Sequence, residues 1–113
     1  MDNAKNDLYY VHKIQEDLAF IMKHMKDVDV KEFERNELLQ DSMMFRLIQI
    51  SENSKKLSDS FKLVEHPVIP WTAIYGLRNR IVHDYGSVDL SIIFDTLKNS
   101  IPELNDIINE EIK

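Results

Sequence analysis

Three residue types suited to cleaving a phosphodiester stand within eight positions, at Arg78, His83 and Tyr85. The planar guanidinium of arginine matches the geometry of phosphate oxygens. Histidine gains and loses a proton near neutral pH, and tyrosine offers a phenolic oxygen. The segment that holds them reads RNRIVHDY over residues 78–85, in a chain with no cysteine and two glycines. These side chains could act on a phosphodiester without a cofactor.

RNA is the phosphodiester that this set would suit. His83 could take the proton from a ribose 2′-hydroxyl or deliver one to the departing 5′-oxygen. Arg78 could stabilise the negative charge that develops around the phosphorus. Because RNA supplies its own nucleophile, the reaction requires no metal. His12, His24 and His66 show no metal-ligand spacing, so we expect neither a metal nor a cofactor.

Helix geometry limits how the motif can work. Successive residues of an α-helix turn by about 100°, which places Arg78 and His83 about 140° apart. Arg78 aligns with Tyr85, whereas His83 aligns with Asn79 and Arg80. The arginine and the histidine could meet on one phosphate if the helix unwinds at its end, or if two copies of the chain meet at a two-fold axis. We expect the second arrangement, a homodimer with its active cleft at the interface.

Apolar residues at spacings of three and four predict the helices that carry this segment. Asn36 is a candidate N-cap for the second long helix. The fold class predicted is all-α, an antiparallel bundle of four or five helices in a single domain over residues 1–113. The stripes indicate helices over residues 8–25, 37–57, 71–83 and 90–108, a short helical turn over 30–35, and a connection over 58–70 with one helical turn at most.

Two features of these helices leave alternatives open. The second long helix is apolar nearly all round between Met43 and Ile50, which indicates burial at the centre of the bundle or against a second subunit. Pro102 removes a backbone donor in the last stripe. Since Ser100 and Glu103 have the spacing of a capping box, the last segment is either one kinked helix or two helices joined at Ser100.

Composition narrows the classes of function. The 113 residues are 43% hydrophobic, as expected for a globular protein with one core. A net charge of −6 has the wrong sign for a protein that coats nucleic acid, so any such contact must be local. The absence of cysteine excludes disulfides and thiolate zinc. With no apparent signal peptide and no stretch of roughly 20 apolar residues, we expect a cytoplasmic protein without membrane contact.

Four of the motif residues carry a resemblance to a known family. Arg78, Asn79, His83 and Tyr85, in the order R-N-x-x-x-H-x-Y, resemble the signature of the HEPN superfamily in its HepT-like toxin branch. The similarity extends over nearly the whole chain. It includes the segments ISENSKKL at 50–57, IPW at 69–71, GLR at 76–78, VHDY at 82–85 and VD at 88–89.

The resemblance implies a metal-independent endoribonuclease that is the toxin of a type VII-like toxin–antitoxin module. Such proteins are homodimers, and their antitoxin is a minimal nucleotidyltransferase, MntA-like, that transfers AMP to the motif tyrosine. Carried onto this sequence, Arg78 and His83 would be catalytic, Tyr85 would be the site of AMPylation, and Asn79 would orient the other side chains. Phosphate and nucleoside added at the tyrosine would exclude RNA by charge and volume.

Plainer interpretations compete with this one. Arg78 and Arg80 could lie on a solvated helix face or form ion pairs with nearby acids. His83 could interact with the helix dipole, and Tyr85 could continue the apolar stripe. Glu52 could hold Arg78 in place or could be an ordinary exposed acid. The motif as a unit favours a function in catalysis. The rival hypothesis, motivated by the net negative charge, is a non-catalytic nucleotide-binding or adaptor subunit of a nucleotidyltransferase complex.

Overall fold

Helices make up the structure, a computed structural model that describes residues 3–83 and 89–112. Within these ranges the chain forms six α-helices and no strand, which confirms the all-α prediction with one or two helices more than expected. Two π-helical turns accompany them, at Ser60–Glu65 and Thr96–Ser100. The α-helices are α1 (Asn3–Met25), α2 (Val30–Arg35), α3 (Glu37–Lys55), α4 (Trp71–His83), α5 (Leu90–Asp95) and α6 (Ile101–Glu111). In the same ranges, no helix combines the length and the hydropathy that a lipid bilayer crossing demands.

Short polar residues begin several of these helices. The side chain of Asn36 accepts a hydrogen bond from the amide of Leu39 at 3.0 Å, which confirms it as the N-cap of α3. Asp29 caps α2 in the same way, and Asp89 caps α5. The hydroxyl and the amide of Ser91 both donate to Asp89, which lowers the pKa of its carboxyl. The predicted turn at 30–35 is therefore a capped helix in its own right.

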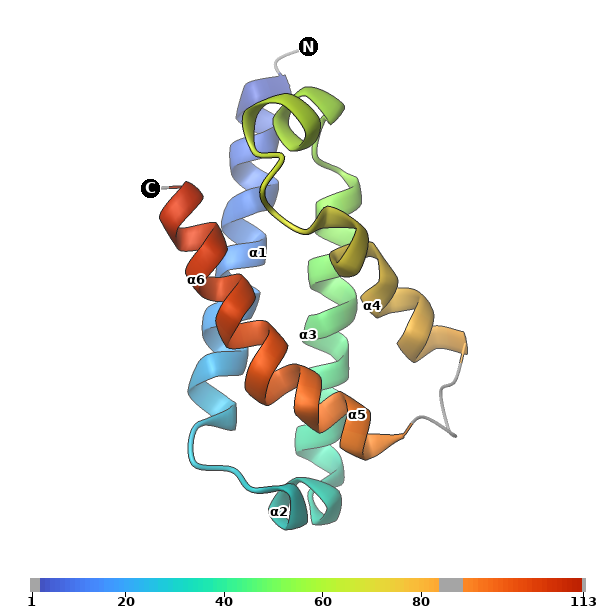
Figure 1. Cartoon of the computed structure of the whole chain (residues 1–113). Coiled ribbons are helices and arrows are strands. Elements are labelled where there is room, and N and C mark those ends of the chain that lie inside the picture. The colour runs from blue at the N-terminus through green and yellow to red at the C-terminus, as the bar shows by residue number, and fades with distance from the viewer. Residues whose placement is uncertain (1–2, 84–88, 113) are drawn as a thin grey trace.

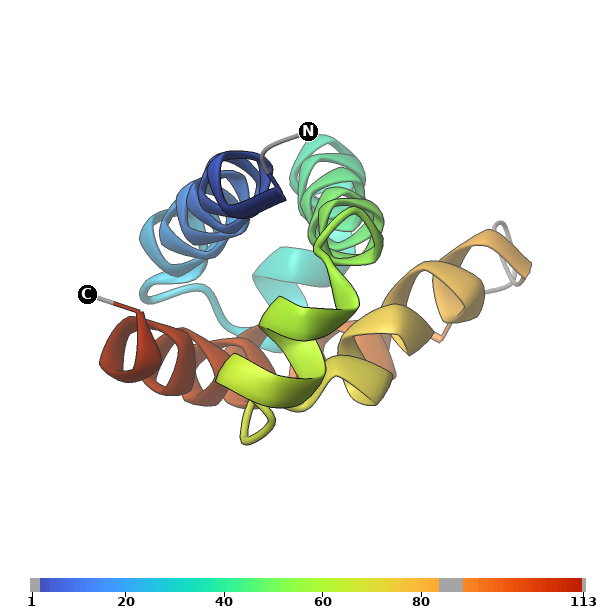
Figure 2. The same cartoon turned by 90° about the horizontal axis from the view of Figure 1, so that it is seen from above.

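Helix α3 occupies the centre of the bundle. It packs against α1 on one flank and α4 on the other (Figure 2). Met43, Leu47 and Ile50 are fully buried, whereas Phe45 is 55% exposed. Of the two predicted reasons for the apolar stretch, burial at the centre of the bundle accounts for the buried residues. The helix ends at Lys55, two residues before the predicted end.

The C-terminal helices run on as one continuous rod across Pro102 (Figure 1). The π-helical turn before the proline ends with the Ile101 amide bonded to the carbonyl of Thr96, five residues back. Because this wide turn has already shifted the hydrogen-bond register, a residue without an amide proton fits after it. Ser100 is itself helical and makes no side-chain cap, so the capping box with Glu103 is wrong.

One hydrophobic core joins all the helices. The predicted stripe of α1 is buried from Val11 to Met25, but Leu8 is 51% exposed and does not belong to it. The π-helical turn Thr96–Ser100 contacts the C-terminal end of α1, where Lys98 Nζ donates to the carbonyl of Met25 at 2.8 Å. The fully buried side chains include Val11, Ile14, Leu18, Ile21, Phe33, Met43, Leu47, Ile50 and Ile108.

An arginine and a carboxylate join α1 to α3. Arg46 Nη1 donates to Asp17 Oδ1 at 2.8 Å, and the guanidinium lies over the ring of Phe20, 3.7 Å from its centroid. The Asp17 side chain is only 9% exposed. Burial raises the pKa of the Asp17 carboxyl, and the hydrogen bond from Arg46 opposes that rise. This pair is built into the seam between the two helices.

Candidate active site

The helix that carries the motif is anchored at its first residue. Trp71 follows Pro70, is 6% exposed, and packs against Phe61 at a ring-centroid distance of 6.3 Å. Its indole Nε1 donates to the carbonyl of His66 at 3.0 Å. The amide of Ile74 donates to the carbonyl of Pro70 at 3.2 Å and starts the helical ladder. The buried indole thus fixes the start of α4, seven residues before Arg78.

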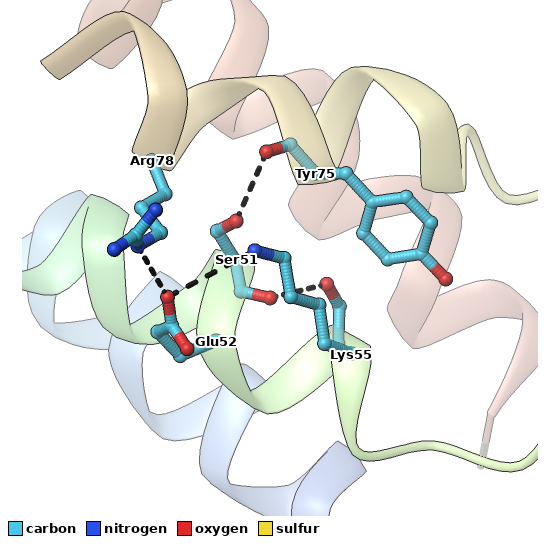
Figure 3. Close-up of polar contacts among 6 residues, drawn as sticks. Ser51, Glu52, Lys55, Tyr75 and Arg78 are labelled. Atoms are coloured by element: carbon cyan, nitrogen blue, oxygen red, sulfur yellow. Dashed lines mark hydrogen bonds and ion pairs between the residues drawn. The ribbon is translucent and has the colours of Figure 1, made fainter. Parts of the chain in front are cut away.

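One small hydroxyl side chain joins α3 to α4 at close range (Figure 3). Ser51 is fully buried, and its Oγ donates to the carbonyl of Tyr75 at 3.2 Å. One turn further along α3, Ser54 Oγ donates to the carbonyl of Ser51 at 2.7 Å. The serine at position 51 therefore leaves room for α4 and also bonds its backbone. The motif helix is held in a fixed register along α3.

Arg78 lies beside Glu52 across this seam. Its Nε is 2.7 Å from Glu52 Oε1, and both side chains reach solvent, with exposed fractions of 39% and 42%. Lys55, one turn along α3, places Nζ 4.0 Å from the same carboxylate oxygen. Two cations thus share one acid at the surface (Figure 3). The structure brings together two of the residues singled out in the sequence, Arg78 and Glu52.

The remaining motif residues are placed less fully. Asn79 is exposed on α4, next to Arg78. His83 is the last residue of α4, and the backbone is helical from Arg78 to that point. The position of the His83 side chain and the whole of Tyr85 lie outside the described residues. The catalytic and modification roles of all these residues stay predictions.

Three residues of this region were given no role in the site from the sequence, although two of them lie in the ISENSKKL segment that carries the resemblance. Ser51 and Lys55 lie on the flank of α3 that faces α4, and Tyr75 lies one turn before Arg78. Helical spacing from Glu52 and Arg78 could have found Lys55 and Tyr75, but not Ser51, which directly precedes Glu52. The phenol of Tyr75 points away from Arg78 and accepts a hydrogen bond from Lys62, a lysine that is only 7% exposed (Figure 3). No sequence signal indicates that last contact.

Over the residues that the structure describes, no group of three or more histidine, aspartate or glutamate side chains could hold a metal ion. His66 pairs with Glu111 instead, with Nδ1 3.2 Å from Oε1. At Arg78, by contrast, a residue of the sequence motif makes the contacts with Glu52 and its neighbour Lys55 described above.

The fold and the motif helix define a class of small helical domain with an arginine and a histidine on one helix, and comparisons with known proteins identify it. The family model described as Ribonuclease HepT-like matches residues 14–111. The chain belongs to the HepT-like ribonuclease family, within the HEPN superfamily.

Named relatives agree with this assignment. A candidate RNase of Caldanaerobacter subterraneus subsp. tengcongensis is 29% identical over 101 residues, which cover 89% of each chain. A protein of Thermococcus cleftensis, named as a candidate ribonuclease HepT, is 30% identical over 84% of this chain and 86% of its own. A candidate RNase of Methanocaldococcus jannaschii is 26% identical over 84% and 86% of the two chains. No solved structure matches the chain. Family and relatives alike support ribonuclease activity.

Proposed function

We propose that this protein is a metal-independent endoribonuclease in which Arg78 and His83 perform the chemistry. The observation that carries the proposal is the placement of Arg78. It is exposed to solvent, yet a carboxylate at 2.7 Å holds it on a helix that continues to His83. An arginine that is both accessible and oriented suits a mobile polyanion such as RNA.

The reaction follows from the functional groups. The ribose 2′-oxygen attacks the phosphorus and loses its proton to a base, while the bond from phosphorus to the 5′-oxygen breaks. The 5′-oxygen takes a proton from an acid, so the products are a 2′,3′-cyclic phosphate and a 5′-hydroxyl. His83 acts as one of these two proton-transfer groups. Arg78 stabilises the extra negative charge on the phosphoryl oxygens in the transition state.

A homodimer could bring Arg78 and His83 together on one phosphate although the two positions do not share a helix face. Because the backbone of α4 stays helical from Arg78 to His83, ideal helix geometry separates these two positions by about 140° around the axis. In a two-fold dimer, Arg78 of one protomer can meet His83 of its partner, and Asn79 can orient either group from the same helix. The proposed active cleft is shared between the two copies.

In a cell, the proposed role is that of the toxin in a toxin–antitoxin module. The partner would be a minimal nucleotidyltransferase of the MntA type that transfers AMP from ATP to the phenolic oxygen of Tyr85. The phosphodiester formed there adds negative charge and bulk two residues from His83, which excludes RNA from the cleft. The resemblance of the RNRIVHDY segment to HepT-like toxins supports this role.

A rival function is a catalytically silent adaptor for a nucleotidyltransferase. The net charge of −6 and the neutralisation of Arg78 by Glu52 favour it, since both weaken the attraction for RNA. The two functions differ in one measurable property. An adaptor binds its partner or a nucleotide but cleaves no RNA.

Cleavage of single-stranded RNA in excess chelator tests the proposal. We expect the wild-type protein to cut RNA and leave 2′,3′-cyclic phosphate ends, detected by mass spectrometry. Arg78→Ala and His83→Ala should each lose activity by about 10²–10⁴-fold. Arg35→Ala is the control, because it removes an exposed arginine on α2, away from the motif helix. Full activity in both motif variants would overturn the proposed site.

Two further measurements test the assembly and the silencing. Light scattering should give the mass of a dimer for the wild-type and the Arg78→Ala proteins, and a monomer that cleaves RNA would refute the shared cleft. Incubation with the cognate nucleotidyltransferase and ATP should add AMP in a mass spectrum. Tyr85→Phe should prevent that addition, and modification elsewhere would contradict the assignment.

A further inference from the structure

A polar cleft of about 400 Å³ lies between α1 and α3. Its lining contains neither Arg78 nor Glu52, so it is distinct from the contact between those two residues. Aromatic, basic and other polar side chains line its walls. The lining includes Tyr9, Tyr10 and Lys13 from α1, together with Phe45, Gln49 and Lys56 from the α3 side.

Two aromatic rings in this cleft are exposed to water. Tyr9 is 58% exposed and Phe45 is 55% exposed, although both belong to helices that bury other apolar residues. Tyr9 is held by an edge-to-face contact with Tyr10 at a centroid distance of 5.2 Å. Exposed rings on rigid helices are platforms on which bases of single-stranded RNA can stack, because every base has a flat face.

A lysine lies over each of the two tyrosine rings of the cleft. Lys13 Nζ lies 5.7 Å from the centroid of the Tyr9 ring, and Lys56 Nζ lies 5.4 Å from that of Tyr10. The third cation of the cleft, Arg46, is committed to Asp17, and Glu16 is the other acid in the lining. Rings bordered by lysines form a local site for bases and phosphates on a molecule whose net charge is −6.

The cleft and the candidate active site share one stripe of α3. Residues spaced by three and four share a helix face, so Phe45, Gln49, Glu52 and Lys56 follow one line along α3. Glu52 is the acid that holds Arg78. The width of a helix with its side chains is about 10 Å, so a strand crossing α3 needs to span only that distance. Single-stranded sites commonly cover about four nucleotides or more.

We propose that the cleft between α1 and α3 binds single-stranded RNA beside the scissile linkage, with bases on Tyr9 and Phe45 and phosphates at Lys13 and Lys56. The site deepens the proposed ribonuclease function and rests on it. It makes a long single strand a better ligand than a dinucleotide, because only the long strand reaches both the cleft and Arg78. The acidic remainder of the molecule confines the strand to this path.

Equilibrium binding tests the cleft independently of cleavage. The probe is a fluorescein-labelled 12-nucleotide polyuridine, titrated by anisotropy into protein that carries His83→Ala, so that the RNA stays intact. Adding Tyr9→Ala and Phe45→Ala together should weaken binding by about 25-fold or more, because each stacked base contributes about fivefold or more and the two factors multiply. The matched control is Leu63→Ala with Val68→Ala, two apolar residues with exposed fractions of 69% and 64% outside the cleft.

Salt dependence separates the lysines from the rings. Lys13→Ala with Lys56→Ala should reduce the slope of log affinity against log salt by about 1.4, since each phosphate contact on a single strand contributes about 0.7. Lys23→Ala with Lys31→Ala, two exposed lysines elsewhere, should leave the slope unchanged.

Three results would overturn the proposal. One is unchanged affinity in the cleft variants, and another is an equal loss in the control variants. The third is a change of molar mass in light scattering for the Tyr9 and Phe45 variant, because it would assign the surface to contact between copies of the chain. Loss of cleavage in Arg78→Ala bears on the active site alone, so failure of the ribonuclease function and failure of the cleft remain distinguishable.

Discussion

Two arginine–carboxylate pairs lie on opposite flanks of α3, and they differ in almost everything except distance. On the α1 side, Arg46 contacts Asp17 at 2.8 Å, with side chains that are 30% and 9% exposed. On the α4 side, Arg78 contacts Glu52 at 2.7 Å, with side chains that are 39% and 42% exposed. The first arginine also lies over a phenylalanine ring, and the second shares its acid with a lysine.

The difference separates an arginine used for packing from one available for binding. Moving Arg46 would leave the buried carboxylate of Asp17 without its partner, which is costly. Releasing Arg78 would leave Glu52 in water and near Lys55, which costs little. A phosphate can therefore compete for Arg78 but not for Arg46. Exposure, rather than the length of the contact, distinguishes the two pairs.

Replacing each arginine by alanine, one at a time, is the strongest test of this contrast. Arg78→Ala should lower kcat/KM for RNA by about 10²–10⁴-fold, because the charge on the transition state loses its partner. Its free energy of unfolding should stay within about 0.5 kcal/mol of the wild type. Cleavage assays and urea unfolding, followed by circular dichroism, measure the two quantities. Equal activity losses in Arg78→Ala and Arg46→Ala would erase the distinction.

Arg46→Ala should show the opposite behaviour. The half-exposed arginine covers Asp17 and Phe20, so its removal should destabilise the fold by about 1–3 kcal/mol. Urea unfolding measures the loss, and Arg35→Ala on α2 is the control, since that arginine is exposed. If Arg46→Ala and Arg35→Ala have the same free energy of unfolding, the contact between Arg46 and Asp17 does not stabilise the fold.

Glu52→Gln sharpens the comparison at the level of kinetics. The carboxylate competes with RNA for Arg78 but also orients it. We therefore expect KM and kcat to fall together, each by up to about fivefold, the factor that corresponds to ~1 kcal/mol for an exposed pair. Steady-state cleavage of a fluorogenic RNA measures both, with Asp41→Asn as an exposed acid of the same helix for control. A rise in KM would indicate that Glu52 does not compete with the phosphate.

The smallest effect is the dependence of stability on pH. The folded state raises the pKa of Asp17 above its ordinary 3.8, so it holds the proton more tightly than the unfolded chain. The stability that this provides is present below pH 3.8 and is lost as the pH rises through the folded pKa. In the Asp17→Asn protein, the free energy of unfolding in urea should no longer show this decrease between about pH 3 and 7. Asp89→Asn should remove a change of opposite sign, because the pKa of Asp89 is lowered.

Local signals in the sequence predict most of the fold. The apolar stripes locate the long helices to within a few residues, and Asn36 is found at the helix start that it was expected to cap. Local rules fail where the hydrogen-bond register changes. Ser100 and Glu103 have a capping-box spacing, but the π-helical turn keeps the backbone helical through both. Tertiary contacts, including the bond from Lys98 to α1, decide that segment.

The candidate site is predicted in part for a similar reason. Arg78 and Glu52 could be singled out in the sequence because an arginine suits a phosphate and a nearby acid could hold that arginine. The structure places the two side chains in contact. The contact between Lys62 and Tyr75 could not be predicted, since it depends on the path of a connection that has no periodic pattern. The position of the His83 side chain relative to Arg78 depends on a second copy of the chain in our proposal, and helical spacing alone can only exclude a shared face.

The wide turn at Thr96–Ser100 has a consequence for how the chain can change during evolution. A residue lost from this turn would tighten it into an ordinary helical turn, while the segments before and after it kept their inward faces. The same deletion before Glu52 in α3 would rotate that acid by about 100° relative to the rest of the helix. Length variation among descendants of this gene should therefore be tolerated in the C-terminal rod and purged from the central helix.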